Sequence, residues 1–460
     1  MKILLVNPIT SNISLSSPDL GLGYLATALK KENHHVDILD CVNLRLTFKK
    51  FEDYIACLDF DVIGFKVFST DLFSVKTSLQ IVRKIKPDVK IILGGAHPSA
   101  FPEQTLQYFE EADFAIRGEA ETGLADLIRN FSNPDMTPKE KIPGLIWRNK
   151  GEIRSNPPVF PQSLDSLGSP DWNLINPCNY PFQTSYLIKS KIVAPLIMTR
   201  GCPHRCTFCS SRSVTGHKIR SHSVSYIIEE IKFLKSNFGI KEVCFIDDNF
   251  LVLKPLVEDL CKQMIKQELG IKWSCFGIRL DLIDQDILRL MEKSGCYLLT
   301  VGIESGSQRI LDHMKRNLTL DVIKEKITLI HIQTNIRIIA NFIMGYPMEE
   351  QEDIYKTIRF AKSLPLYGAN FYTFQPMPGT EIFDELIAKK ELKVINWDLM
   401  GQDRMPFIPQ GISQQKFKWL FFLAFMNFYA RPKIILNVLL ATRSLERLKY
   451  IFYRIFRIIK

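Results

Sequence analysis

Short apolar runs alternate with helix-length stretches over the first third of the chain. Five runs rich in valine and isoleucine have the length of buried strands: residues 2–6, 36–39, 61–68, 90–93 and 114–116. Between them lie stretches of helix length at residues 20–31, 72–86 and 103–110. Strands that alternate with helices predict an α/β fold, a doubly wound parallel sheet with helices on both faces.

The loops after these strands are the expected ligand end of the sheet. They span residues 7–12, 69–70, 94–99 and 118–121. In open parallel sheets, ligands bind beyond the carboxyl ends of the strands. Gly94 and Gly95 allow a backbone to approach a ligand closely. They fit equally well a reading in which they make tight strand-to-helix turns.

Two stretches rich in Pro, Ser, Asn and Asp follow, at residues 133–143 and 156–177, and such stretches punctuate a chain rather than build a core. A short hairpin is expected between them, at residues 144–148 and 152–154. We therefore predict four parts: a first domain (1–132), a linker (133–191), a second domain (192–390) and a helical C-terminal region (391–460).

Three cysteines carry the central chemistry of the second domain. A strand at residues 193–199 runs into a loop in which Cys202, Cys206 and Cys209 have the spacing C-x3-C-x2-C. Three thiolates satisfy three irons of a [4Fe–4S] cluster and leave the fourth iron open. The alternatives are a zinc site completed by His204 or His217, a four-cysteine cluster, and three unrelated thiols.

Further strands and helices extend the second domain. Strands are expected at 242–250 and 272–280, and helices at 224–237, 284–294 and 320–331. Three further strand segments, at 301–307, 340–350 and 373–380, are implied by the family resemblance described below. Six such units make a partial (β/α)6 barrel, whose ligands gather at the C-terminal rim of the strands. Asp247 and Asp248 are ligand candidates or helix caps. Arg279 suits a carboxylate ligand or a structural salt bridge, and a buried Glu304 needs a partner.

Composition describes a folded protein without a disulfide scaffold. Of 460 residues, 46% are hydrophobic and 23% charged, and ten are cysteine. The first ten residues lack the h-region and cleavage site of a signal peptide. We expect a reducing, cytoplasmic location.

The net charge of +10 is concentrated in the tail. From Gly411 to Lys460 there are ten Lys or Arg and a single acid, Glu446, so this segment carries +9. A uniformly basic nucleic-acid binder is therefore not expected. The apolar runs at 417–429, 434–441 and 450–460 are shorter than the ~20 residues of a membrane span. The last is amphipathic and basic, which suits an anionic membrane interface; the alternative is packing on the barrel.

Several motifs resemble those of the cobalamin-dependent radical SAM enzymes. The cysteine spacing, with Phe208 before the last cysteine, resembles the radical SAM hallmark, and VGIESGS (301–307) and TFQPMPGT (373–380) resemble later strand motifs of that family. PDLGLGYLA from Pro18, GGAHP from Gly94 and GEAE from Gly118 resemble the family's cobalamin domain. The resemblance implies a Rossmann-like cobalamin domain followed by a partial TIM-like barrel.

The resemblance also implies residue roles. The cluster ligands would be Cys202, Cys206 and Cys209. Contacts to S-adenosylmethionine (SAM) would come from Phe208, Asp247, Asp248, Arg279, Glu304, Ser305, Pro378 and Gly379. Contacts to cobalamin would come from Gly21, Ser69, Thr70, Gly94, Gly95, His97, Gly118 and Glu119. The D-x-H-x-x-G loop is missing after the first strand, which implies cobalamin without a histidine ligand; His97 is a substitute candidate or packs in its own turn.

By this resemblance the protein cleaves SAM to a 5′-deoxyadenosyl radical with a [4Fe–4S] cluster, and cobalamin is its second cofactor. Methylation of an unactivated carbon of a hydrophobic substrate is the expected outcome. Cyclisation or rearrangement of a tetrapyrrole or lipid, and a non-catalytic corrinoid or zinc-binding protein, remain alternatives. The expected partners are a small molecule, an electron donor such as flavodoxin or ferredoxin, and the inner face of the membrane through the tail, without nucleic acid.

Overall fold

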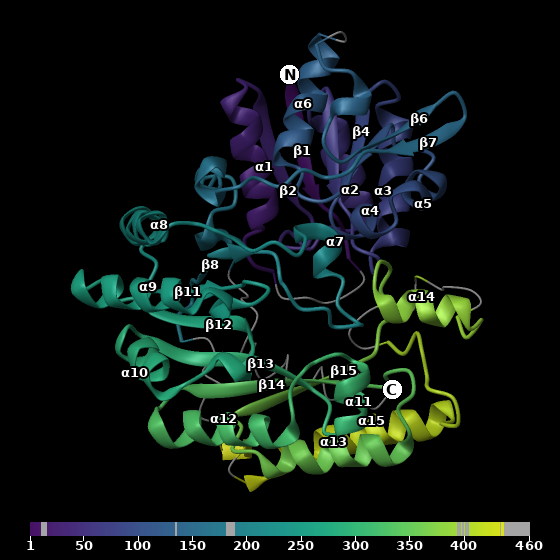
Figure 1. Ribbon diagram of the computed structural model, residues 1–460. Coiled ribbons are helices and arrows are strands. Elements are labelled where there is room, and N and C mark those ends of the chain that lie inside the picture. The colour runs from purple at the N-terminus through teal and green to yellow at the C-terminus, as the bar shows by residue number, and fades with distance from the viewer. Residues whose placement is uncertain are drawn as a thin grey trace.

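The computed structural model contains two large sheets, one above the other in Figure 1. It describes residues 1–10, 16–133, 136–180, 189–392, 397, 400, 404–432 and 434–436. The predicted amphipathic helix at 450–460 lies outside the described residues, as does most of the run at 434–441.

The first sheet is doubly wound. Its parallel strands are β1 (Lys2–Asn7), β2 (His35–Asp40), β3 (Val62–Lys66), β4 (Lys90–Gly94) and β5 (Phe114–Ile116), in the order β2-β1-β3-β4-β5. Successive side chains of a strand point to opposite faces. Accordingly Ile3 and Leu5 pack under α1 (Leu20–Lys31) and α6 (Glu121–Ser132). Leu4 and Val6 pack against α2 (Phe48–Cys57), α3 (Leu72–Ile85) and α5 (Pro102–Tyr108) on the other face.

Three features of this domain differ from the sequence prediction. Helix α2 was not predicted, because its sequence FKKFEDYIAC is polar and buries only Phe51 and Ile55. The expected helix at 103–110 is preceded by a short α4 (Ala96–Ala100). The hairpin β6 (Leu145–Asn149) and β7 (Glu152–Ser155) joins the sheet antiparallel beside β5, so the first sheet continues beyond residue 132.

The prediction that the linker only punctuates the chain is wrong. Leu164, Trp172 and Ile175 are buried in the same apolar core as the barrel helices. Trp172 donates its indole N–H to Glu230 of α8 (Val224–Phe238) at 2.7 Å. The polar residues of this segment obscured these few large apolar side chains, which hold the linker against the second domain. Its short 3-10 turns are η1 (Lys139–Lys141), η2 (Leu164–Leu167) and η3 (Pro177–Asn179).

The second sheet is the expected partial barrel of six parallel strands. They are β8 (Ala194–Leu196), β11 (Glu242–Phe245), β12 (Lys272–Ile278), β13 (Cys296–Glu304), β14 (Arg337–Met344) and β15 (Gly368–Thr373), adjacent in chain order. Its helices are α8, α9 (Lys254–Lys266), α10 (Gln285–Lys293), α11 (Gln308–His313), α12 (Leu320–Gln333), α13 (Gln351–Ser363) and α14 (Glu381–Ala388).

The strand predicted at 193–199 is divided in two. After β8 the chain bends, and Thr199–Arg200 forms β9, which pairs antiparallel with β10 (Arg220–Ser221). The bend exists because Asp247 accepts hydrogen bonds from the backbone N–H groups of Met198 and Thr199. Those groups are therefore lost to the sheet, and the chain can leave the barrel towards the first domain.

The aromatic run of the tail forms α15 (Gln414–Tyr429), which lies along α13 (Figure 1). Its buried face comprises Phe417, Leu420, Phe421, Ala424 and Phe428. Packing on the barrel is thus the correct reading for this run, while Trp419 and Met426 on the other side are 46% and 43% exposed. Among the described residues, no helix is long and apolar enough to cross a membrane.

Phe417→Ala tests the contribution of α15 to the barrel. The ring is fully buried, so its removal leaves a cavity, and we expect the free energy of unfolding to fall by ~3–5 kcal/mol. Urea denaturation measures this change. Trp419→Ala is the matched control, and its effect should stay within about 0.5 kcal/mol. Equal small effects of both variants would mean that α15 is not part of the core.

Candidate active site

The cysteine loop lies between β9 and α7 (Ser211–Thr215), where the barrel meets the first domain. Gly201 begins the loop with φ +93°, and a Cβ there would come within 2.3 Å of the Lys218 carbonyl oxygen. No other residue type fits this bend without displacing the backbone. Cys206 is buried, Cys202 and Cys209 are partly exposed, and all three are free thiols.

Arg316 and the carboxylate of Asp248 are charged groups near the thiols. Arg316 Nη1 lies 3.5 Å from Cys206 Sγ. Arg316 Nε and Arg279 Nη1 are buried without a hydrogen-bond partner among the described residues. Burial raises the pKa of the Cys202 and Cys209 thiols. Buried guanidinium groups with spare donors fit an anionic group held by thiolates, and SAM carries a carboxylate that they can bind.

The donor set fits a cluster better than a single metal ion. A [4Fe–4S] cluster takes one thiolate on each of three irons, whereas zinc takes all its ligands on one ion. Within the described ranges, no three His, Cys, Asp or Glu side chains converge as ligands of one metal ion.

Two predicted SAM residues, Asp247 and Asp248, brace the loop. Asp247 is buried and also accepts a hydrogen bond from Thr199 Oγ1 at 2.7 Å. Burial raises its pKa to about 6, and the hydrogen bonds from Thr199 and Met198 oppose that shift. Asp248 accepts hydrogen bonds from Ser211 and Thr215 of α7 at 2.8 and 2.9 Å. Neither carboxylate caps α9, because the residue before that helix is Leu253.

Glu304 has the buried partner that the sequence called for. It ends β13 with φ +73°, and Oε1 lies 3.8 Å from Arg316 Nη2. Burial raises the pKa of Glu304, and the charge of Arg316 counteracts this. Arg316 was missed by sequence reasoning, because it stands in a polar loop with no strand-end pattern. Ser305 Oγ accepts from the Ser307 N–H at 3.1 Å, so it supports the turn.

The remaining predicted SAM residues have defined surroundings. Arg279 is paired with Asp281 at 3.1 Å, as in the salt-bridge alternative, and its Nη1 is the unpartnered donor noted above. Phe208 packs in an apolar cluster beside Met314. The loop with Pro378 and Gly379 lies against α7, where Ser213 Oγ is 3.4 Å from the Gly379 carbonyl oxygen. The loop after β15 therefore contacts α7, the helix that directly follows the cysteine loop.

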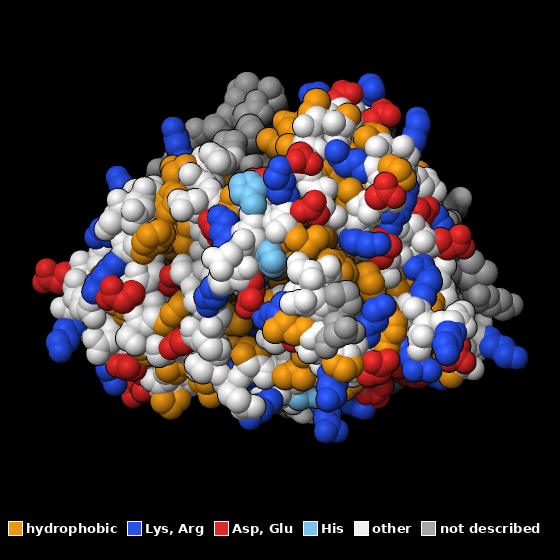
Figure 2. Space-filling model, turned by 90° about the horizontal axis from the view of Figure 1, so that it is seen from above, with side chains coloured by type: hydrophobic (Ala, Val, Ile, Leu, Met, Phe, Trp, Pro, Cys, Tyr) orange, Lys and Arg blue, Asp and Glu red, His pale blue; other side chains and the backbone are white. Residues whose placement is uncertain are grey.

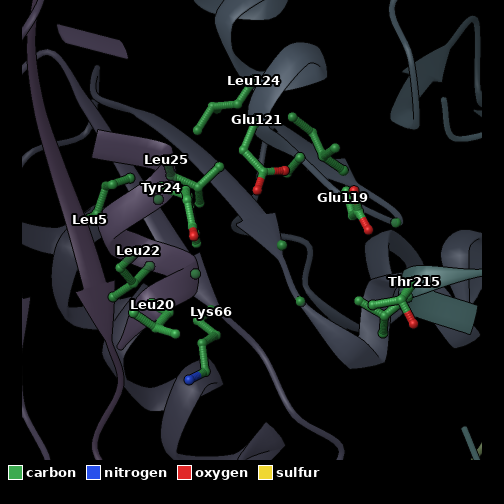
Figure 3. A pocket seen from close by; sticks show the side chains of 18 of the residues that line it. Leu5, Leu20, Leu22, Tyr24, Leu25, Lys66, Glu119, Glu121, Leu124 and Thr215 are labelled. Carbon is green, nitrogen blue, oxygen red and sulfur yellow. The ribbon is translucent and has the colours of Figure 1, made fainter. Parts of the chain in front are cut away.

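A cavity of about 280 Å³ lies between the two domains (Figure 3). Leucines of β1 and α1 line one side in the figure, with Glu119 and Thr215 on the other. Five predicted cobalamin residues line it: Gly21, Gly94, Gly95, Gly118 and Glu119. A Cβ added at Gly94 would meet no atom closer than 4.0 Å, so the backbone there is open to a ligand. A cavity lined by leucines and by glycines without side chains fits a flat cofactor.

The other three predicted cobalamin residues do not line this cavity. Ser69 Oγ lies 2.9 Å from His97 Nδ1, and the His97 ring packs edge-on against Phe101 and Trp397. Thr70, next to Ser69, is likewise absent from the lining. The reading of His97 as a packed side chain is therefore the one that the structure supports.

The burial of His97 predicts that the protein loses stability in acid. Burial lowers its pKa to about 4, against about 6.5 when unfolded. On going from pH 7 to pH 5 the unfolded chain gains a proton here and the folded chain does not, so the free energy of unfolding falls by about 2 kcal/mol. Urea denaturation at both pH values measures the loss. In His97→Leu the loss between pH 7 and pH 5 should be about 2 kcal/mol smaller; an unchanged loss would contradict the assignment.

Comparison with known proteins gives the family. The B12 binding domain model matches residues 6–128, and the Radical SAM superfamily model matches 196–361. The chain is 30% identical over 447 residues to the uncharacterized methyltransferase PH0819 of Pyrococcus horikoshii, covering 95% of this chain and 94% of that protein. This chain belongs to the cobalamin-dependent radical SAM family. It is a radical SAM enzyme whose cofactors are a [4Fe–4S] cluster, SAM and cobalamin.

Other relatives of this radical SAM enzyme differ in reaction. The anaerobic magnesium-protoporphyrin IX monomethyl ester cyclase of Rubrivivax gelatinosus is 25% identical, over 85% of this chain and 71% of the cyclase. The solved methyltransferase TsrM from Kitasatospora setae, with cobalamin and [4Fe–4S] cluster bound, superposes with TM-score 0.72 at 16% identity, over 93% and 88% of the two chains. That likeness shows the shared fold.

Proposed function

We propose that this enzyme methylates an unactivated carbon of a hydrophobic small molecule. The observation that carries the proposal is the cavity with two unlike walls. Gly94 and Gly95 at the carboxyl edge of the first sheet form one wall, and Thr215 and Asp248 beside the cysteine loop contribute to the other. A substrate between them would lie near both cofactors, and such positioning supplies much of a rate enhancement. The methyltransferase relatives support this choice of reaction.

The chain's own residues have separate tasks in this scheme. When bound, the cluster and SAM generate the radical that removes a substrate hydrogen, and cobalamin carries the methyl group. Cys202, Cys206 and Cys209 hold the cluster, and Arg279 and Arg316 offer their spare N–H donors to its ligands. The leucines of α1 and β1 hold the apolar part of cobalamin and exclude water.

The test uses the full chain, reconstituted without oxygen with iron, sulfide and hydroxocobalamin. We would supply SAM deuterated at its methyl group, a strong reductant and an extract of apolar metabolites, and follow the label by mass spectrometry. We expect 5′-deoxyadenosine and a product that carries the deuterated methyl group. Deoxyadenosine with an altered but unlabelled product would support a cyclase, in line with the Rubrivivax relative. If neither product forms, the protein acts as a corrinoid-binding protein and the proposal is overturned.

We also propose two partners. A small one-electron carrier of the flavodoxin or ferredoxin class reduces the cluster. The tail contacts an anionic membrane from the cytoplasmic side: Trp419, Met426, Ile435 and Leu436 are exposed apolar side chains, and the basic segment follows them. We expect co-sedimentation with vesicles that contain phosphatidylglycerol, and loss of binding in Trp419→Ser combined with Met426→Ser. Equal sedimentation with neutral vesicles would overturn the electrostatic part.

A further inference from the structure

Four buried charges join the two domains beside the cavity. Glu119 follows β5 and Glu121 begins α6, whereas Arg200 belongs to β9 and Arg220 to β10. Arg220 binds both carboxylate oxygens of Glu119 at 2.7 Å. Arg200 Nη1 lies 2.8 Å from Glu121 and 3.3 Å from Glu119. We call these four residues the interdomain ion-pair cluster; their side chains are at most 9% exposed.

The two arginines stand at either end of the segment that carries the cysteines. Arg200 is followed by Gly201 and Cys202, and Arg220 lies opposite Arg200 in the β9–β10 pair. Within the segment, the Cys202 N–H donates to the Gly216 carbonyl oxygen at 3.3 Å. Arg220 Nη2 also donates to the Thr215 carbonyl oxygen at 2.7 Å. Movement of the arginines would therefore displace both ends of the segment that carries the cysteines.

A second set of contacts supports Arg200. Its guanidinium lies 5.0 Å from the centre of the Tyr24 ring of α1. The Tyr24 hydroxyl is 3.2 Å from His222 Nε2, and His222 Nδ1 is 3.0 Å from Asp165 of the linker. Because a carboxylate only accepts, Nδ1 carries the proton and Nε2 accepts from Tyr24. First domain, linker and barrel thus meet around the same arginine.

Charge pairs of this kind fix one arrangement. Two arginines balance two carboxylates, and a bidentate pair tolerates little rotation or sliding. Leaving one of these charges without its partner in a buried site is unfavourable, so alternative domain orientations are disfavoured. Glu119 binds Arg220 through both carboxylate oxygens and also lines the cavity, so it connects the domain interface with the cavity wall.

We propose that Arg200 and Arg220 are positioning residues: held by Glu119 and Glu121, they set the distance between the cysteine loop and the cobalamin cavity. The role of that distance in catalysis rests on the proposed function; the fixed orientation of the two domains does not. The linker then connects the domains, and the interdomain ion-pair cluster orients them.

Glu119→Gln tests the proposal because it removes one charge and keeps the shape. The matched control is Arg129→Gln, which breaks ion pairs to Glu32 and Asp126 away from the interface. Arg200→Lys is the second variant. It keeps the positive charge but loses the planar guanidinium that binds two carboxylates at once. Bound iron and cobalamin are measured in each reconstituted full-length protein, so that loss of a cofactor is distinguished from loss of position.

The deciding readout is the distance between the reduced cluster and cob(II)alamin, measured by pulsed EPR. We expect one narrow distance in the parent protein and in Arg129→Gln, and a broadened distribution in Glu119→Gln and Arg200→Lys with iron and cobalamin retained. With methyl-deuterated SAM and the extract of apolar metabolites, labelled product should fall at least tenfold while deoxyadenosine formation and the KM for SAM change little. An unchanged distance distribution overturns the proposal.

A readout without cofactors keeps the proposal separate from the proposed function. Amide hydrogen exchange of the apo protein should speed up in β9, β10 and the first turn of α6 in Glu119→Gln and remain unchanged in Arg129→Gln. Unchanged exchange in both variants overturns the ion-pair cluster as the positioning element. If the parent protein binds no cobalamin and the two variants still show this exchange pattern, the proposed function alone is overturned.

Discussion

Replacing Cys202, Cys206 and Cys209 together with alanine should abolish iron binding and SAM cleavage and leave cobalamin binding intact. Each thiolate serves one iron, so no ligand remains to hold the cluster, and bound iron should fall from about four per chain to background. Cobalamin should remain because none of these cysteines lines the cavity between the domains. Iron analysis, the visible spectrum and dithionite-driven deoxyadenosine formation measure the three quantities.

Cys57 and Cys178 provide the matched control for this result. Both are exposed free thiols outside the cysteine loop. Their double replacement with alanine should leave iron content and SAM cleavage unchanged. Iron retained in the triple variant, or lost in the control, would place the cluster elsewhere in the chain.

Removing the positive charge of Arg316 should produce a large loss of stability. In Arg316→Met the carboxylate of Glu304 stays buried, at 9% exposure, without its partner. Breaking a buried pair in this way costs ~3–5 kcal/mol. The pKa of Glu304, already raised by burial, should rise further once the arginine is gone.

The sign of the pH dependence follows from that shift. The folded variant holds a proton on Glu304 that the unfolded chain releases near pH 4.5, so stability present in acid is lost as the pH rises through the folded pKa. Relative to the parent protein, Arg316→Met should therefore be less destabilised at pH 5 than at pH 7 in urea denaturation.

A double variant distinguishes the effect of Arg316 on stability from its effect on SAM cleavage. Glu304→Gln combined with Arg316→Met should recover most of the stability, because no buried charge is left unpaired. It should still fail to cleave SAM, since the donor beside Cys206 is absent. Equal destabilisation in the single and double variants would mean that the pair has no energetic role.

Outside the tail, positive and negative charges on the protein nearly balance. Outside the tail the net charge is +1, and Figure 2 shows positive and negative side chains interspersed over the face seen from above. Long-range attraction of a charged partner to this face is therefore weak. The basic tail differs from the rest of the chain in this respect.

The sequence determined those features that depend on near neighbours in the chain. Valine- and isoleucine-rich runs predicted all five parallel strands of the first sheet, because burial on both faces demands continuous apolar residues. The cysteine spacing and Gly201 are local features too, and they predict that this loop holds the cluster. Five residues predicted to contact cobalamin line the cavity between the domains, and three of them, Gly94, Gly95 and Gly118, lie at or just after strand ends.

Only the tertiary structure decided which distant groups meet. Arg316 pairs with Glu304, Arg220 with Glu119, and Asp247 interrupts the strand at Thr199. A buried charge or carboxylate requires a partner, but its identity depends on which loops the folded sheets bring together, and spacing along the chain does not encode it. The same reason accounts for His97, whose packing between Phe101 and Trp397 joins segments far apart in the sequence.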